Sequence, residues 1–360
     1  MLKPRLGDPS YLASSVWQST NLKHIVASFP RINWGTIYGS IQRFGKGFLS
    51  VHSPTNRHWL GFILSLNAAV LWGILPIAIK EVIASMDGVS IVWYRFLIAG
   101  LVLFCYLGLK RRLPSITGKA TSVYAMLLVA AIALCINYSL FSMSLNYVNA
   151  ETAEAVIQLT TLFLILGGVF IYGEPFFALQ KFGTLLLLAG LLLFFNNRIP
   201  QLLAVENVEQ IGVIMVLFSA MAWTVYALIQ KQLLLTYSSA QTLLLFYCIS
   251  LLALFPFATP SSVFALSSTQ FWLLLFCCAN TVIAYGSFAE AMQHWEASKV
   301  SAVLALAPLI TIASLKLVVF INPDYVHSDK LNTLALMGAL VLVLGSVLIA
   351  IVPLLRGKQS

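Results

Sequence analysis

Ionisable residues inside long apolar stretches are the first sign of chemistry in this chain. Arg95, Glu154, Lys316 and Glu290 each fall within a stretch that is otherwise almost free of charge. A charged side chain in apolar surroundings is costly, so it is expected to face a pathway, a partner or a surface. We expect the first three to lie at a similar depth and Glu290 to lie near the end of its stretch.

A stripe of polar residues runs along one of these stretches. Glu151, Glu154, Gln158 and Thr161 are separated by three, four and three residues, which places them on one face of a helix. In a membrane such a face turns toward a cavity or another helix rather than toward lipid. The matching face in the second half of the chain carries Ser301 but no charge.

The three charged candidates leave alternatives open. Glu154 is either a protonatable or cation-binding group in a pathway, or the partner of Arg95 or Lys316 in a structural ion pair. Arg95 alternatively extends toward the membrane surface or locks neighbouring helices together. Lys316 either holds an anionic substrate as a compact charge or neutralises an acid.

Four aromatic residues recur at related positions. Trp72 and Trp223 stand 151 residues apart, and Tyr138 and Tyr285 stand 147 residues apart. They fall well inside their apolar stretches, whereas aromatic belt residues gather at the membrane surface. Either they line a cavity, as a cage for an apolar, aromatic or cationic solute, or they pack helices tightly together.

Two neighbours of these aromatics are weaker candidates for substrate contact. Tyr226 lies one turn after the second tryptophan, and Asn137 precedes the first tyrosine. The candidate substrate-binding set is therefore Trp72, Arg95, Asn137, Tyr138, Glu154, Gln158, Trp223, Tyr226, Tyr285, Ser301 and Lys316.

Motifs of catalysis and cofactor binding are missing from the sequence. It contains no Gly-rich phosphate loop and no Gly-x-Ser-x-Gly motif. The five histidines form no metal-binding pair, and the five cysteines all lie in apolar stretches without metal or disulfide spacing. We therefore predict no enzymatic activity, no cofactor and no metal site.

The elements that must position these residues are about ten membrane helices. Hydrophobic residues make up 60% of the chain and charged residues 9%, against about 25% charged residues in soluble proteins. Continuous Leu-rich runs of roughly 20 residues predict spanning helices rather than barrel strands. The expected spans lie near 60–82, 89–109, 122–146, 150–172, 179–196, 209–231, 240–258, 268–292, 297–321 and 331–353.

The net charge of +9 indicates topology rather than nucleic-acid binding. With the N-terminus inside and ten spans, sixteen of the 21 Lys and Arg residues fall on the inner face and three on the outer face. This bias predicts that both termini are cytoplasmic. It also predicts attraction of the inner face to anionic lipid.

The chain is expected to contain two related halves, each with an odd number of spans, so that one half is inverted relative to the other. Gly183 and Gly190 recur as Gly338 and Gly345, at an offset of 155 residues. We predict an all-α membrane protein of two inverted five-helix repeats. The expected parts are a basic cytoplasmic N-terminal arm (1–58), the repeats (59–197 and 208–353) and a cytoplasmic tail (354–360). For the arm, a disordered chain and an interfacial helix are both open.

Short motifs in a fixed order carry a resemblance to a known family. They are Leu71-Trp72-Gly73, Trp93-Tyr94-Arg95-Phe96, Ala153-Glu154-Ala155-Val156-Ile157, Tyr172-Gly173-Glu174-Pro175, Ala222-Trp223, Ala297-Ser298-Lys299-Val300-Ser301-Ala302-Val303 and Leu306-Ala307-Pro308-Leu309. Together they resemble the drug/metabolite transporter superfamily, of the type built from two EamA domains. The resemblance covers residues 60–353.

The resemblance implies a carrier of the bacterial cytoplasmic (inner) membrane that works by alternating access, with a cavity lined chiefly by spans 1, 3, 4, 6, 8 and 9. Its substrate would be a small organic solute: an amino acid, nucleobase, related metabolite or amphipathic drug-like compound. Export is favoured, by exchange or by proton coupling through Glu154. Membrane lipid is the other expected partner, and nucleic acid is not. A homodimer, a channel and a non-transporting receptor or scaffold are left open.

The chain departs from the family pattern once in each half. The family usually has proline where Thr161 stands, and this chain has it only at the equivalent Pro308. Because proline loosens a spanning helix, we expect the two halves to flex unequally. The outer loop that contains Asn322-Pro323-Asp324 is also longer than its counterpart.

Overall fold

The computed structural model describes residues 57–172, 176–199, 207–294 and 297–356. Nearly all of the N-terminal arm therefore lies outside the described residues, as does the end of the predicted C-terminal tail. Within the described ranges the secondary structure is helical, without a strand.

The helices follow the predicted spans closely. They are α4 (His58–Val82), α5 (Gly88–Leu109), α6 (Thr121–Ser144), α7 (Ala150–Ile157), α8 (Leu159–Tyr172), α9 (Ala178–Phe194), α11 (Val208–Leu233), α12 (Ser239–Leu254), α13 (Ser268–His294), α14 (Ala297–Leu304), α15 (Ala307–Ile321) and α16 (Thr333–Arg356), with the short 3-10 turns η1 (Phe255–Phe257) and η2 (Pro260–Ala265). Among the described residues, nine stretches are long and apolar enough to cross a membrane, and α9 is a shorter apolar helix. The pairs α7–α8 and α14–α15 each make up one span.

Local capping explains where several helices begin. The Asp87 carboxylate accepts a hydrogen bond from the Ser90 backbone N–H at 2.8 Å, and so caps the start of α5. Asn207 caps α11 by accepting from the Glu209 N–H at 2.9 Å. Each contact satisfies one of the N–H groups that a helix start leaves without an intrahelical partner.

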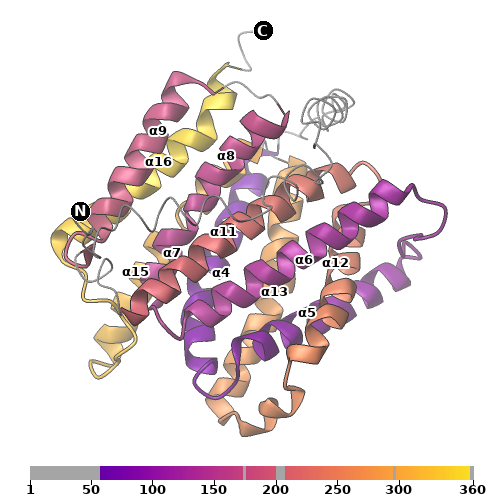
Figure 1. The fold of residues 1–360 in the computed structure, drawn as a ribbon, viewed down its shortest axis with the longest axis horizontal. Coiled ribbons are helices and arrows are strands. Elements are labelled where there is room, and N and C mark those ends of the chain that lie inside the picture. The colour runs from indigo at the N-terminus through magenta and orange to yellow at the C-terminus, as the bar shows by residue number, and fades with distance from the viewer. Residues whose placement is uncertain (1–56, 173–175, 200–206, 295–296, 357–360) are drawn as a thin grey trace, which may run out of the picture. The chain divides into compact units, whose positions relative to one another are not determined.

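The two repeats interlock helix by helix (Figure 1). Helix α4 packs on α13 and α6 packs on α11, so the first helix of each repeat lies against the third helix of the other. Helix α5 packs on α12, and α9 packs on α16. This exchange of equivalent contacts is what two inverted five-helix repeats produce, and it confirms the predicted fold class.

The recurring glycines bring α9 and α16 into close contact. A Cβ atom at Gly190 would lie 2.3 Å from the Leu342 backbone nitrogen, and one at Gly345 would lie 2.4 Å from the Leu187 backbone nitrogen. Small residues let membrane helices approach closely enough for extensive van der Waals contact. The repeated glycines therefore mark the interface that joins the last helices of the two repeats.

Both fourth helices of the repeats are broken, and the breaks are equivalent. The first lies at Gln158, between α7 and α8, and the second at Ala305–Leu306, between α14 and α15. Gln158 and Ala305 are 147 residues apart, which is the repeat offset. Pro308 accompanies only the second break. The two repeats therefore do not differ in whether their fourth span is broken, because the first span breaks without a proline.

Candidate functional site

A cavity of about 200 Å³ lies where the two broken spans meet their neighbours. Its walls come from the six spans that the resemblance implied, with α5 in addition. The lining residues are Trp72, Leu75, Arg95, Asn137, Tyr138, Phe141, Glu154, Ile157, Gln158, Thr160, Thr161, Leu164, Trp223, Tyr285, Ser301, Leu304, Ala305 and Ala307.

Most of the residues singled out in the sequence meet at this cavity. Nine of the eleven candidates line it: Trp72, Arg95, Asn137, Tyr138, Glu154, Gln158, Trp223, Tyr285 and Ser301. Their position is thereby known, whereas their role in binding a substrate stays a prediction.

Two candidates lie elsewhere. Tyr226 is 2% exposed and packs edge-on against Phe246, with ring centroids 5.5 Å apart. Lys316 is exposed on the surface of α15 rather than in the cavity. Residue spacing placed both on the right helices, but the rotation of each helix turns these side chains away from the lining. Glu290, near the end of α13, pairs with His294 at 3.1 Å.

The aromatic residues form one continuous wall across the repeats. Trp72 of α4 meets Tyr285 of α13 edge-on, with ring centroids 5.2 Å apart. Tyr285 in turn lies 6.1 Å from Tyr138 of α6. The wall thus combines helices from both halves. Its ring contacts join Trp72 to Tyr285 and Tyr285 to Tyr138.

Arg95 is held in place by neutral groups. Its side chain is 3% exposed, and its Nε donates to Thr281 Oγ1 at 2.9 Å. Its guanidinium carbon lies 4.6 Å from the centroid of the Tyr138 ring, a cation–π contact. These two contacts orient the guanidinium and leave its two terminal NH₂ groups free of ion pairs with any described residue.

The polar stripe divides between two places. Glu154, Gln158 and Thr161 line the cavity, as the stripe predicted. Glu151 instead accepts hydrogen bonds from Ser328 Oγ at 2.6 Å and from the Asp329 backbone N–H at 3.1 Å. One turn of α7 therefore separates a cavity-facing carboxylate from one that binds a loop.

Glu154 and Arg95 are buried in the same cavity without pairing. Glu154 is 6% exposed, and among the described residues it makes neither a hydrogen bond nor an ion pair. The structural ion pair that the sequence left open is therefore not formed with Arg95 or with Lys316. Buried ionisable groups are normally paired, so a carboxyl group and a guanidinium group that line one cavity without an ion pair are candidates for contact with a solute.

Asn137 lines the cavity and also fastens two helices together. Its side-chain amide donates to the backbone oxygen of Ser219 at 3.0 Å and to Ser219 Oγ at 2.9 Å. Ser219 Oγ donates back to the Asn137 carbonyl at 3.0 Å. This reciprocal contact joins α6 to α11, so part of the hydrogen-bonding capacity of Asn137 is already used.

Several lining residues were not foreseen. Phe141 lies one turn after Asn137 and Tyr138 on α6, so helical spacing alone could have indicated it. Leu164 and Leu304 are apolar residues in apolar spans, and nothing in their type distinguishes them from residues that face lipid. Thr160 sits at the first turn of α8, beside a break that the sequence did not indicate.

The breaks place helix ends at the cavity. Thr160 and Thr161 belong to the first turn of α8, and Ala307 belongs to the first turn of α15. The backbone N–H groups at a helix start carry partial positive charge and favour anionic groups. Broken helices that present such ends near the middle of a membrane form the solute sites of many transporters.

Comparison with known sequences identifies the family. The sequence profile of the EamA-like transporter family matches residues 59–196 and 210–351. The chain belongs to this family. Both repeats are matched, in agreement with the two-repeat architecture, and the chain is accordingly a membrane transporter.

Named relatives are transporters as well. An "Uncharacterized transporter" of Haemophilus influenzae is 39% identical over 292 residues, which cover 81% of this chain and 95% of the relative. The "Uncharacterized inner membrane transporter YhbE" of Escherichia coli K12 is 38% identical over 293 residues, which cover 81% of this chain and 91% of that protein. A more distant relative from the same bacterium, a "Probable amino-acid metabolite efflux pump", is 22% identical over 79% of this chain and 92% of its own length.

A solved protein structure shares the fold. It superimposes with a TM-score of 0.58 and 19% sequence identity, and the match covers 83% of this chain and 98% of that one. At this level of identity the likeness concerns the arrangement of helices alone.

Proposed function

We propose that this transporter carries a small zwitterionic solute, an amino acid or a closely related metabolite, across the inner membrane by alternating access. The observation that carries the proposal is the pair of buried ionisable side chains, Arg95 and Glu154, that line one cavity without an ion pair between them. Arg95 would bind the carboxylate of the solute through its terminal NH₂ groups, and Glu154 would bind the ammonium group. Both contacts are charge-assisted hydrogen bonds, the strong class in proteins.

The surroundings of the two charges support this substrate class. The helix starts of α8 and α15 favour the carboxylate end of the solute, while the aromatic wall offers apolar contact to its side chain. The relative named as an amino-acid metabolite efflux pump lends support to the same class and to export. Location in the inner membrane is supported by YhbE, and cytoplasmic termini are supported by the charge bias.

Energy coupling is proposed to act through exchange of solutes or through protonation of Glu154. A carboxylate that faces the substrate and has no protein partner can bind either the solute ammonium group or a proton. Competition between these two ligands would couple their movements in opposite directions. Saturable counterflow of a labelled amino acid in proteoliposomes would distinguish such a carrier from a channel or a receptor.

Thermal-shift measurements with matched ligands test the charge assignment. Purified protein is heated with free amino acids, with their amides and with their N-acetyl derivatives, because a ligand that binds the folded state raises its apparent stability. We expect free amino acids to bind about 10- to 150-fold more tightly than either derivative, the effect of one charge-assisted hydrogen bond.

Variants assign each charge to its partner. In Arg95→Gln the preference for the free acid over its amide should disappear, while the preference over the N-acetyl derivative remains. In Glu154→Gln the opposite pattern is expected, and Lys316→Gln should behave like the unmodified protein. Equal stabilisation of the unmodified protein by all three kinds of ligand would contradict a zwitterionic substrate.

A further inference from the structure

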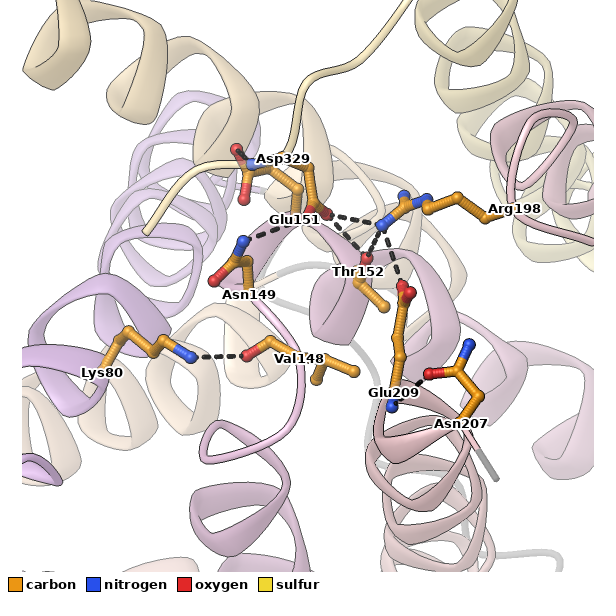
Figure 2. A network of polar contacts seen from close by, with 9 residues as sticks. All are labelled: Lys80, Val148, Asn149, Glu151, Thr152, Arg198, Asn207, Glu209 and Asp329. Atoms are coloured by element: carbon orange, nitrogen blue, oxygen red, sulfur yellow. Dashed lines mark hydrogen bonds and ion pairs between the residues drawn. The ribbon is translucent and has the colours of Figure 1, made fainter. Parts of the chain in front are cut away.

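A polar network surrounds Arg198 at the end of the bundle where α7 begins (Figure 2). The guanidinium Nη1 of Arg198 lies 2.9 Å from Thr152 Oγ1, 2.9 Å from Glu209 Oε1 and 3.2 Å from Asp329 Oδ2. The guanidinium also lies over the rings of Phe194 and Phe195, at 5.4 and 5.2 Å from their centroids. We call this group, with Asn149, Glu151 and Ser328, the Arg198 network.

The network ties four separate segments together. Arg198 follows α9, Thr152 belongs to α7, Glu209 lies at the start of α11, and Asp329 lies in the loop between α15 and α16. Asp329 is held further by Thr152 Oγ1 at 2.6 Å and by Asn149 Nδ2 at 3.1 Å. Segments from both repeats are therefore connected through one arginine and one aspartate.

Two residues of α4 also contact this end of the bundle. Tyr325, in the same loop, donates its hydroxyl to Glu81 Oε1 at 2.7 Å. Burial, and then the hydrogen bond to Glu81, raise the pKa of Tyr325, so this hydroxyl stays protonated and able to donate. Lys80 donates to the backbone oxygens of Leu145, the C-cap residue of α6, at 2.5 Å and of Val148 at 3.0 Å, and so places a cation at the carbonyl end of α6.

Burial shows that α7 is covered at this end of the bundle. Every residue of α7 from Ala150 to Val156 is buried, and Thr152 is completely inaccessible. Its repeat counterpart α14 lies at the opposite end, and of its residues 299–304 only Val300 is buried. Equivalent helices are thus packed at one end of the cavity and half-open at the other.

The loop that completes the network exists in only one repeat. Eleven residues (322–332) connect α15 to α16, whereas five (173–177) connect α8 to α9. The longer loop supplies Asp329 and Ser328 to the network and Tyr325 to the contact with Glu81. Because only the second repeat carries the long loop, the contacts that this loop makes are found at one end of the bundle and not at the other.

We propose that the Arg198 network is a latch that holds this face closed and must open in every transport cycle. Arg198 is its central residue because its guanidinium contacts α7, α11 and the 322–332 loop together. Release of Arg198 would free the start of α7, which lies one turn from Glu154, and would open the cavity to this face. The latch rests on the alternating-access carrier proposed above.

Cysteine labelling tests the latch without a substrate. In full-length protein with its five native cysteines replaced by alanine, Thr161→Cys places a single thiol on the cavity wall. The rate of reaction with a membrane-impermeant maleimide is measured in sealed vesicles from the face that carries the network. The exposed Ser261→Cys, at the same end, reports which vesicle orientation presents that face.

The latch predicts faster labelling when it is weakened. Arg198→Gln should raise the rate from this face by about fivefold or more, and Asp329→Asn should raise it in the same direction. Asp329→Asn removes one ion pair and keeps the size of the side chain, so it provides the test if Arg198→Gln does not fold. Lys330→Gln, the neighbouring exposed charge, is the matched control and should leave the rate unchanged.

Unchanged labelling in the folded Arg198 and Asp329 variants would overturn the latch. An equal increase in the Lys330 variant would overturn it too, because the effect would then follow from charge removal alone. Since no solute is needed, these outcomes are independent of whether the substrate is zwitterionic. Failure of the substrate proposal appears only in the thermal-shift experiment with amino-acid ligands.

Discussion

The two broken spans share a backbone break but not their chemistry. Glu154 stands at the repeat position of Ser301, and Gln158 stands at that of Ala305, each at an offset of 147 residues. The first span therefore brings a carboxylate and an amide to the cavity, and the second brings a hydroxyl and a methyl group. The shared break creates helix ends at the cavity, while the unshared side chains decide what those ends can bind.

The environments of the two spans differ as well as their composition. Helix α7 is packed beneath the Arg198 network, whereas α14 is half-open at the other end of the bundle. Inverted repeats allow equivalent helices to occupy unlike environments at one time, and alternating access exchanges those environments during transport. We propose that the repeat supplies the frame, that the ionisable residues found only in the first half supply selectivity, and that the long loop found only in the second half supplies direction.

Replacement of Glu154, the carboxylate of the first broken span, is expected to have the largest effect on transport. Glu154→Gln should lower amino-acid counterflow by about 10- to 150-fold, because it removes a charge-assisted hydrogen bond to the solute. It should also abolish any proton-driven component of the flux in sealed vesicles. Ser301→Ala, at the equivalent position, should change counterflow by less than about threefold. If proton coupling persists in Glu154→Gln, the carboxylate of the first broken span is not the coupling group, and the proposed chemical difference between the two spans is wrong.

The shared frame can be tested at a glycine. Gly190→Ala should lower the free energy of unfolding by about 1–3 kcal/mol, since the added methyl group requires α9 and α16 to separate. Steric trapping or thermal unfolding in detergent would measure the change. Gly286→Ala is the control, because a Cβ atom there meets nothing within 4 Å. Similar losses at both positions would show that close helix contact is not what the repeated glycines provide.

The smallest effect is expected at the proline of the second break. Pro308→Ala should keep counterflow within about fivefold of the unmodified rate, because the first span breaks without proline and one hydrogen bond contributes only about 1 kcal/mol. The reverse change, Thr161→Pro, would remove the bond from the Thr161 N–H to the Gln158 oxygen, which measures 3.0 Å. A large loss of counterflow in Pro308→Ala would mean that the two breaks have different causes.

Much of the fold could be predicted because it depends on local properties. Span length, hydropathy and the repeated glycines and aromatics are all visible along the chain, and all ten expected spans have counterparts in the structure. Helical spacing also placed Glu154, Gln158 and Thr161 together on the cavity wall. These properties need no knowledge of distant contacts, since 3.6-residue periodicity by itself decides which side chains share a face.

Other features depend on contacts between distant residues. The break at Gln158 has no proline to indicate it, and the rotations that turn Lys316 and Tyr226 away from the cavity follow from packing against other helices. Arg95 is oriented by Thr281, which is 186 residues away in the chain. Sequence spacing could not indicate whether Arg95 and Glu154 would pair with each other or stand apart.

The amino-acid sequence by itself determined that this protein crosses a membrane about ten times, in two related halves with unequal charge. Hydrophobicity and periodicity are sufficient for that, because each span satisfies its own backbone. Only the tertiary structure decided that two buried ionisable side chains share a cavity without pairing, and that Arg198 joins four segments at one end. Those arrangements arise when helices from opposite repeats pack together, and the distances between their side chains exist only after that packing.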